Sequence, residues 1–309
     1  MKTIQLGGAD PLAVSAVALG CMHLAELDEA EASRLIHTAL ELGVTYFDHA
    51  DIYGAGASEA LFGRVLAAEP SLRDKLLLQT KCGIVPGVMY DWSKEHIVAS
   101  VEASLARLHT DHLDVLLMHR PDALWEPEEV AEAFHALRQS GKVQRFGVSN
   151  QSPAQMALFR HYLGEEPAAD QLQFSLTNCN LVRAGLEVNM VTPGAVDRDG
   201  GALDYCRLHG IVVQAWSPFK YHSETGRGVF VGSEKFPELN AALAQVAAVH
   251  GASPTTVAAA WVLRHPAGIQ LIAGTTKPAR LAEVAAAAQL TLTRQEWYRL
   301  YLAAGHILP

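Results

Sequence analysis

Several features that mark other classes of protein are missing from this sequence of 309 residues. It has only four cysteines, widely scattered and without a C-x-x-C pair, which favours reduced thiols over a disulfide framework or a zinc site. No run of basic residues exceeds two, and 24 basic against 33 acidic residues give a net charge of −9. This balance argues against nucleic acid or an anionic membrane as a partner.

Long apolar runs are also missing. None approaches the ~20 residues that cross a bilayer, and the first ten residues lack the charged start and apolar stretch of a signal peptide. We therefore expect a soluble, cytoplasmic protein. The sequence also lacks a G-x-G-x-x-G turn directly after a strand, which argues against a doubly wound dinucleotide-binding fold.

What the sequence does contain is a regular alternation of apolar, strand-like runs and helical segments. Residues 2–15 carry Gly7-Gly8 between two short alternating segments, which predicts a β-hairpin. Eight apolar runs follow, at residues 16–20, 44–48, 76–81, 113–119, 143–149, 169–174, 211–216 and 269–274. Helix-start signals lie between them, such as Asp28 with Glu31 and the pair Ser152-Pro153. Because parallel neighbours need crossover helices, the pattern predicts an α/β fold, a (β/α)8 TIM barrel in one domain over residues 1–309.

Two long stretches interrupt this spacing, at residues 177–201 and 217–237. Both should emerge at the carboxyl-terminal rim of the barrel. Loops of this length in a compact domain are usually functional, so they are candidate lids or walls of a substrate pocket, with a disordered excursion as the alternative. Their conformation is not predicted.

Polar residues end three consecutive predicted strands. The second strand ends at Asp48, the third at Lys81 and the fourth at His119, and Tyr53 lies in a glycine-containing turn just beyond Asp48. In a barrel these ends meet at the carboxyl rim, where enzymes of this fold keep their active sites. Each residue alone has an ordinary structural explanation, but the coincidence of four at equivalent positions predicts one site.

These residues stand in patterns that resemble the aldo-keto reductase superfamily. Asp48 and Tyr53 match its F-D-x-A-x-x-Y-G pattern, Lys81 ends the next strand, and His119 lies in the L-L-x-H context. The family keeps an Asp, Tyr, Lys, His tetrad in a barrel. The resemblance therefore implies that these four residues are catalytic.

Other segments extend the resemblance from the hairpin to the last helix. Residues 141–150 resemble the family's G-K-[IV]-[RK]-x-x-G-[VL]-S-N segment, and residues 170–174 resemble its N-Q-[VI]-x-[YF] strand. Within the superfamily, the sequences of residues 48–51 and of the C-terminal segment 293–299 look most like those of a poorly characterised branch of bacterial oxidoreductases.

The resemblance implies reduction of an aldehyde or ketone, or alcohol oxidation in reverse, on a small-molecule substrate. Tyrosine has a reference pKa of ~10, so Tyr53 needs help to act as general acid. A cation ~4 Å away contributes ~4 kcal/mol at an effective dielectric of ~20, so we expect Lys81 to lower the pKa of Tyr53. We expect Asp48 to anchor Lys81, and His119 to hydrogen-bond the carbonyl oxygen and orient it.

The resemblance also implies that NADP (NADPH) binds across this rim. The residues expected at its nicotinamide end are Ser149, Asn150, Gln171, Trp216 and Ser217. Those expected at its phosphate end lie where small residues open a helix after the eighth strand, and they are Gly274, Thr275, Arg280 and Glu283. Arg280 resembles the ligand of the 2′-phosphate and Glu283 the adenine contact. Gly274 stands where many members have lysine, so the strength of the NADP preference over NAD stays open.

Two other classes of function stay open. Some proteins of this fold are redox-sensing regulatory subunits that bind the cofactor, although no sequence feature identifies a protein partner. A metal-dependent barrel hydrolase is less favoured, because His109 and His112 precede the fourth strand and should lie at the rim opposite His119. Apolar residues on rim segments are expected either in the pocket wall or beneath a loop, namely Met22, Ile52, Tyr90, Trp92 and Phe219.

Overall fold

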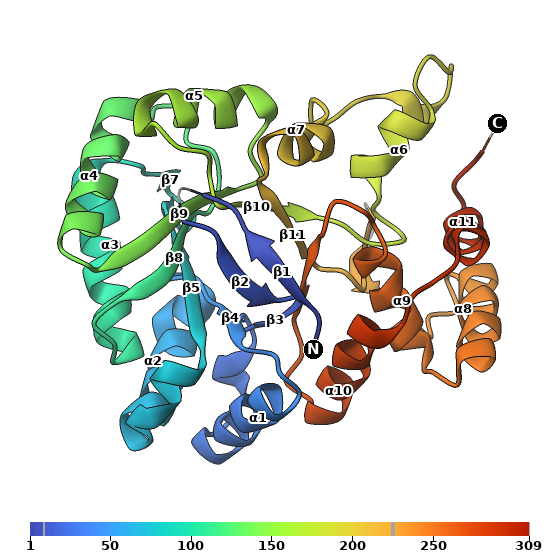
Figure 1. Cartoon of the computed structure of the whole chain (residues 1–309), viewed down its shortest axis with the longest axis horizontal. Helices are drawn as coiled ribbons and strands as arrows, with labels where there is room; N and C mark the ends of the chain where they lie inside the picture. The colour runs from blue at the N-terminus through green and yellow to red at the C-terminus, as the bar shows by residue number, and fades with distance from the viewer. Residues whose placement is uncertain (9, 224–225, 309) are drawn as a thin grey trace.

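Eight parallel strands form a closed barrel at the centre of the molecule (Figure 1). The structure is a computed structural model, and it describes residues 1–8, 10–223 and 226–308. The barrel strands are β3 (Val17–Gly20), β4 (Tyr46–Asp48), β5 (Leu77–Cys82), β8 (Leu113–Met118), β9 (Val143–Ser149), β10 (Ala169–Gln173), β11 (Val212–Trp216) and β14 (Gln270–Ala273). Each corresponds to one of the eight predicted runs, so the predicted (β/α)8 barrel is confirmed.

The predicted hairpin is confirmed as well, and it closes the amino-terminal end of the barrel. It pairs β1 (Thr3–Leu6) with β2 (Leu12–Ser15) in antiparallel fashion, and Figure 1 shows it lying across the barrel. The Gly7 N–H donates to the carbonyl of Ala168, directly before β10, at 3.1 Å. A Cβ on Gly7 would lie 2.3 Å from a backbone oxygen, so only glycine fits this contact.

Helices surround the barrel (Figure 1). They are α1 (Glu29–Glu41), α2 (Ala57–Ala68), α3 (Lys94–Leu108), α4 (Pro127–Gln139), α5 (Pro153–Leu163), α6 (Asn180–Leu186), α7 (Ala202–His209), α8 (Pro237–His250), α9 (Pro254–Leu263), α10 (Pro278–Ala286) and α11 (Arg294–Ala303). The predicted capping box of Asp28 and Glu31 starts α1, and Ser152 caps α5. No single helix in the described part of the chain is long and apolar enough to cross a membrane; α8 and α9 reach that length only together, across a 90° bend.

Both long loops contain secondary structure of their own. The first holds α6 and a 3-10 turn, η4 (Pro193–Ala195), and the second holds the short strands β12 (Lys220–Ser223) and β13 (Gly226–Val229). A further hairpin, β6 (Ile84–Val85) and β7 (Met89–Tyr90), follows β5 and was not predicted. These additions lie beyond the carboxyl ends of the strands, where the polar residues predicted for the site also lie.

Candidate active site

The carboxyl ends of β4, β5 and β8 lie side by side, because these strands are neighbours in the barrel. Asp48 is the last residue of β4, Lys81 is the penultimate residue of β5, and His119 directly follows β8. The His119 N–H donates to the carbonyl of Cys82 at 2.9 Å, which fixes the start of the loop after β8. Parallel pairing therefore brings three predicted catalytic residues to one rim.

Lys81 is the centre of this group. Its Nζ lies 2.8 Å from Oδ1 of Asp48 and 3.0 Å from the hydroxyl oxygen of Tyr53, and it also donates to the carbonyl of His49 at 2.8 Å. Lys81 is fully buried and Asp48 is 2% exposed. The ring of Tyr53 lies edge-on to His119, with centroids 6.0 Å apart. All four residues predicted as a tetrad thus adjoin one another.

A strained turn presents Tyr53 to Lys81. Tyr53 begins the 3-10 element η2 (Tyr53–Gly56), in which Gly54 has φ 58° and Ala55 has φ 53°. Asn150 and Ser217, which follow β9 and β11, also have positive φ, at 61° and 51°. Non-glycine residues rarely adopt this conformation, and backbone strain of this kind concentrates at functional sites.

The charges of the tetrad depend on burial and on the close pairs. Burial by itself lowers the pKa of Lys81, but Asp48 and Tyr53 outweigh it and raise that pKa, so the ammonium stays charged. Burial raises the pKa of Tyr53, and the nearby Lys81 opposes this without overcoming it. The expected influence of Lys81 on the pKa of Tyr53 has the predicted sign, but the net shift is upward because desolvation of the phenolate is the larger effect.

His119 is held as a neutral imidazole. Burial, together with the positive charges of Lys81 and Arg120, lowers its pKa to about 2. Its Nδ1 is buried without a hydrogen-bond partner among the described residues. A neutral imidazole has one N–H donor and one acceptor nitrogen, so His119 can donate a hydrogen bond to a ligand in the adjoining cavity.

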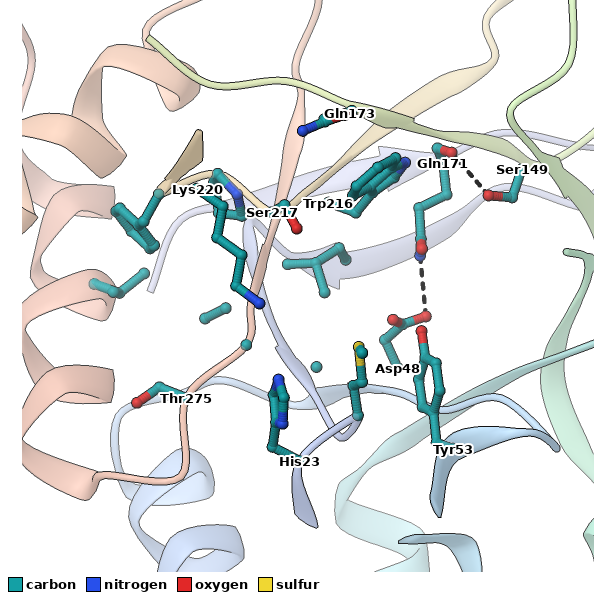
Figure 2. A pocket seen from close by; sticks show the side chains of 18 of the residues that line it. His23, Asp48, Tyr53, Ser149, Gln171, Gln173, Trp216, Ser217, Lys220 and Thr275 are labelled. Atoms are coloured by element: carbon teal, nitrogen blue, oxygen red, sulfur yellow. Dashed lines mark hydrogen bonds between the residues drawn. The ribbon is translucent and has the colours of Figure 1, made fainter. Parts of the chain in front are cut away.

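A cavity of about 690 Å³ opens above the tetrad (Figure 2). Asp48, Tyr53, His119, Thr275 and Arg280 are among the residues that line it, and Figure 2 shows Thr275 across the space from Asp48 and Tyr53. Figure 2 shows the side chain of Lys220 extending into this space from the loop after β11. The cavity therefore runs from the tetrad to the start of α10.

Most of the residues predicted to bind a cofactor line this cavity. Those that do are Ser149, Asn150, Gln171, Trp216, Ser217, Gly274, Thr275 and Arg280. Glu283 is not among the lining residues; it is half-buried on α10, and its backbone carbonyl accepts from Thr256 at 2.8 Å. A Cβ built on Gly274 would have no atom within 4 Å, so the space beside this residue is open.

The residues expected at the nicotinamide end are joined by hydrogen bonds. Trp216 Nε1 donates to Oδ1 of Asn150 at 3.2 Å, and Nδ2 of Asn150 donates to the hydroxyl of Ser149 at 2.7 Å. Ser149 in turn donates to the backbone carbonyl of Gln171 at 2.9 Å, a bond drawn in Figure 2. The side-chain amide of Gln171 points the other way, toward Asp48. Hydrogen bonds thus link Trp216, Asn150, Ser149 and Gln171 into one wall next to the tetrad.

The structure decides between the two alternatives left open for the apolar rim residues. Met22, Ile52 and Phe219 line the cavity. Trp92 is instead buried against Trp125, with ring centroids 5.1 Å apart, and Tyr90 lies half-exposed on β7. Both belong to the unpredicted β6–β7 hairpin region, which carries them away from the cavity.

Several polar residues of the cavity were missed by the sequence reasoning. Arg120, Gln173 and Lys220 line it, and the buried Nε2 of Gln173 has no partner among the described residues. The spacing offered a signal for one of them, because Gln173 lies two residues after Gln171 and so faces the same side of β10. Arg120 lies in the loop after β8, and Lys220 begins the short strand β12, which the sequence did not predict.

Known proteins resemble this chain over nearly its whole length. The model of the Aldo/keto reductase family matches residues 16–301. A 6-dehydroglucose reductase of Novosphingobium aromaticivorans is 39% identical over 99% of this chain and 96% of its own, and the uncharacterized oxidoreductase YcsN of Bacillus subtilis is 39% identical over all of both chains. A Bombyx mori aldo-keto reductase in complex with NADP has a TM-score of 0.74 at 21% identity, over 98% of this chain and 92% of that one, and shares the fold.

Proposed function

The chain belongs to the aldo/keto reductase family, and from this premise we propose that it reduces an aldehyde or ketone to an alcohol with NADPH. The observation that carries the proposal is Lys81 Nζ, shared between Asp48 at 2.8 Å and Tyr53 at 3.0 Å. Bound NADPH supplies the hydride. This chain must then supply a proton, hold the carbonyl and keep water away.

Tyr53 is the proposed general acid. Its raised pKa keeps the phenol protonated at neutral pH, which is the form that donates. As hydride arrives, the carbonyl oxygen becomes alkoxide-like, and an alkoxide is a much stronger base than a phenolate. Lys81 stabilises the phenolate that remains, and a general acid of this kind contributes about 10²–10⁴-fold in rate.

Asp48 and His119 have supporting roles in this proposal. Asp48 accepts from Lys81 and fixes the direction of the ammonium toward Tyr53. His119 stays neutral because its pKa is about 2, so it orients the carbonyl by one N–H donor without competing as an acid. In this proposal Asp48 supports proton transfer through Lys81 and Tyr53, and His119 positions the substrate.

The residues along the cavity fit NADP(H). Ser149, Asn150 and Gln171 form a polar wall beside the tetrad, where the nicotinamide carboxamide would be held, with Trp216 as the stacking aromatic. Arg280 lines the far end at the start of α10, where backbone N–H groups and a guanidinium suit a phosphate.

Changing Arg280 to alanine tests the cofactor assignment. We expect Arg280→Ala to weaken NADPH binding about 10–100-fold and to leave NADH binding within about twofold, because only NADPH carries the 2′-phosphate. Quenching of tryptophan fluorescence measures both dissociation constants. Equal losses for the two cofactors would contradict a 2′-phosphate site at Arg280.

An oxygen-rich aldehyde is the proposed substrate class. Arg120, Gln173 and Lys220 offer hydrogen-bond donors within the cavity, and they suit hydroxyl groups better than a bare hydrocarbon chain. The relative named 6-dehydroglucose reductase is named for a sugar aldehyde. Sugar-derived aldehydes should therefore head any substrate panel.

The decisive experiment follows the absorbance of NADPH and of NADH with sugar-derived, aliphatic and aromatic carbonyls. We expect steady turnover with NADPH and the highest kcat/KM for a sugar-derived aldehyde. Tight NADPH binding without turnover on any carbonyl would overturn the enzyme and favour the cofactor-sensing alternative. Turnover that is highest for unsubstituted aldehydes would overturn the substrate class alone.

A further inference from the structure

A layer of glutamine side chains fills the barrel interior just below the tetrad. Its members come from four strands, β5, β10, β11 and β14, and are Gln79, Gln171, Gln214 and Gln270. Three of them are fully buried and Gln171 is 3% exposed. An amide buried at this depth is costly unless its donors and acceptor are satisfied, so the hydrogen bonds of the layer have to form a consistent set.

The set starts at Asp48, whose ionised carboxylate can only accept. Nε2 of Gln79 donates to Oδ1 of Asp48 at 2.5 Å, and Nε2 of Gln171 donates to the same oxygen at 3.0 Å. The second hydrogen of each amide goes to Oε1 of Gln214, at 2.9 Å from Gln79 and 3.0 Å from Gln171. Both amides thus use both hydrogens, which fixes their orientation.

The donor-to-acceptor order continues from Gln214 to the opposite end of the barrel. Nε2 of Gln214 donates to Oε1 of Gln270 at 2.8 Å and to Oε1 of Gln79 at 3.0 Å. Gln270 then donates to the backbone carbonyl of Ser15, in the hairpin that closes the barrel, at 2.8 Å. The hydroxyl of Tyr46 gives Gln79 its other donor, at 2.7 Å. Flipping any one amide would set donor against donor or acceptor against acceptor.

We propose that Gln79 is a positioning residue for the tetrad. Gln79 and Gln171 hold Oδ1 of Asp48 from below, and this leaves the carboxylate turned toward Lys81, which in turn faces Tyr53. The proposal rests on the proposed function for its consequence in catalysis. Its structural content, that the direction of Asp48 depends on Gln79, is independent of it.

Gln79→Glu tests the proposal with almost no change in shape. A protonated carboxyl has one hydrogen where the amide of Gln79 uses two, so either Asp48 or Gln214 loses its donor. The matched control is Gln270→Glu, in the same buried layer, because Gln270 donates one hydrogen, to Ser15, and a protonated carboxyl can replace it. Gln79→Leu, which removes both hydrogens, serves if the glutamate variant does not fold.

Crystal structures supply the first readout, which needs no turnover. In the Gln79 variants we expect the Asp48 carboxylate to rotate and Lys81 Nζ to move beyond hydrogen-bond distance of Tyr53, whereas Gln270→Glu should keep the 3.0 Å contact. An unchanged Asp48, Lys81 and Tyr53 arrangement in the Gln79 variants would overturn the proposal.

Kinetics supply the second readout. At about pH 7 we expect kcat of Gln79→Glu and Gln79→Leu to fall about tenfold or more, while their KM for NADPH stays within about twofold of wild type. For Gln270→Glu we expect both kcat and KM for NADPH to stay within about threefold of wild type. Loss of kcat equal to that of Gln270→Glu would indicate a merely structural role and overturn the proposal. A wild-type enzyme without turnover would instead overturn the proposed function, and the crystal structures would still decide the role of Gln79.

The pH profile separates the two Gln79 variants. The titratable groups that face position 79 are Tyr46 and Asp48 from β4 and Lys81 from its own strand, with Cys21 beyond Asp48. Two carboxyl groups in contact share one proton, and losing it sets two anions against each other. We therefore expect kcat of Gln79→Glu to fall further as pH rises above neutral, and that of Gln79→Leu to keep the wild-type profile. Parallel profiles in the two variants would mean that position 79 does not act through Asp48, and the proposal would be lost.

Discussion

The two faces of the barrel strands differ in chemistry. On β4, Phe47 points outward to the helices, where its ring packs 5.2 Å from Phe62, while Tyr46 and Asp48 point inward. On β5, Leu78 is part of the outer core, while Gln79 points inward to the glutamine layer and Lys81 points inward to the tetrad. Residues that are neighbours in sequence thus belong to two different environments.

The two faces differ in whether their stabilising interactions depend on the direction of the side-chain groups. The outer core is apolar and continuous between strands and helices, and hydrophobic burial depends on area and packing rather than on angles. The inner face is hydrogen-bonded from the glutamine layer to Tyr53, and each bond has a donor, an acceptor and a required geometry. We infer that the outer face mainly sets stability and the inner face mainly sets chemistry.

The strongest test of this division is Tyr53→Phe, on the inner side. We expect kcat to fall about 100–10,000-fold, because the general acid is removed. NADPH affinity should stay within about threefold and the free energy of unfolding within about 1 kcal/mol, because the ring itself remains. Stopped-flow and fluorescence titration give kcat and affinity, and unchanged turnover would remove Tyr53 from the mechanism.

The reverse effect is expected for Phe62→Ala, on the outer side. Phe62 is fully buried and packs on Phe47 and His49, with centroid distances of 5.2 and 4.7 Å. Truncation should lower the free energy of unfolding by about 3–5 kcal/mol and leave kcat per folded molecule within about threefold. Urea unfolding and active-site titration measure the two quantities. A fall in kcat as large as that of Tyr53→Phe would show that the faces are not separable.

A smaller, pH-dependent effect is expected at His49, also on the outer face. Burial and the charge of Lys81 lower its pKa to about 3, against about 6.5 in the unfolded chain, so only the unfolded state gains a proton as the pH falls below about 6.5. His49 should therefore cost the protein about 2 kcal/mol of stability between about pH 7 and pH 5. In urea unfolding, the free energy of unfolding of His49→Leu should fall by about 2 kcal/mol less than that of wild type between about pH 7 and pH 5. Equal losses would show that His49 does not drive acid destabilisation.

Sequence patterns predicted the barrel well because they report on the outer face. Alternation of apolar runs and helix caps placed all eight strands, and Asp28 and Ser152 start helices as expected. Burial against helices needs only apolar side chains at the right period, and that is visible in one dimension. The tetrad was equally visible, because Asp48 and Lys81 interrupt apolar runs at equivalent ends.

The cavity walls were predicted less well. For Tyr90 and Trp92 the sequence left open whether they line the pocket or lie beneath a loop, and the structure places both outside the cavity; Arg120 and Lys220, which were not predicted, line it. Loop residues have no periodicity that fixes a direction. The direction of the Tyr53 pKa shift was likewise beyond the sequence, because it depends on how far burial outweighs Lys81.

The sequence by itself determined the barrel, the order of its elements and the polar residues that meet at its carboxyl-terminal rim. Only the tertiary structure decided how Gln79, Gln171 and Gln214 meet, since they come from three different strands and no sequence pattern says which polar side chains of the barrel interior will pair. Hydrophobic burial is a property of single positions and can be read along the chain. A hydrogen-bond chain is a property of pairs, and its donors and acceptors are matched only when the barrel has closed.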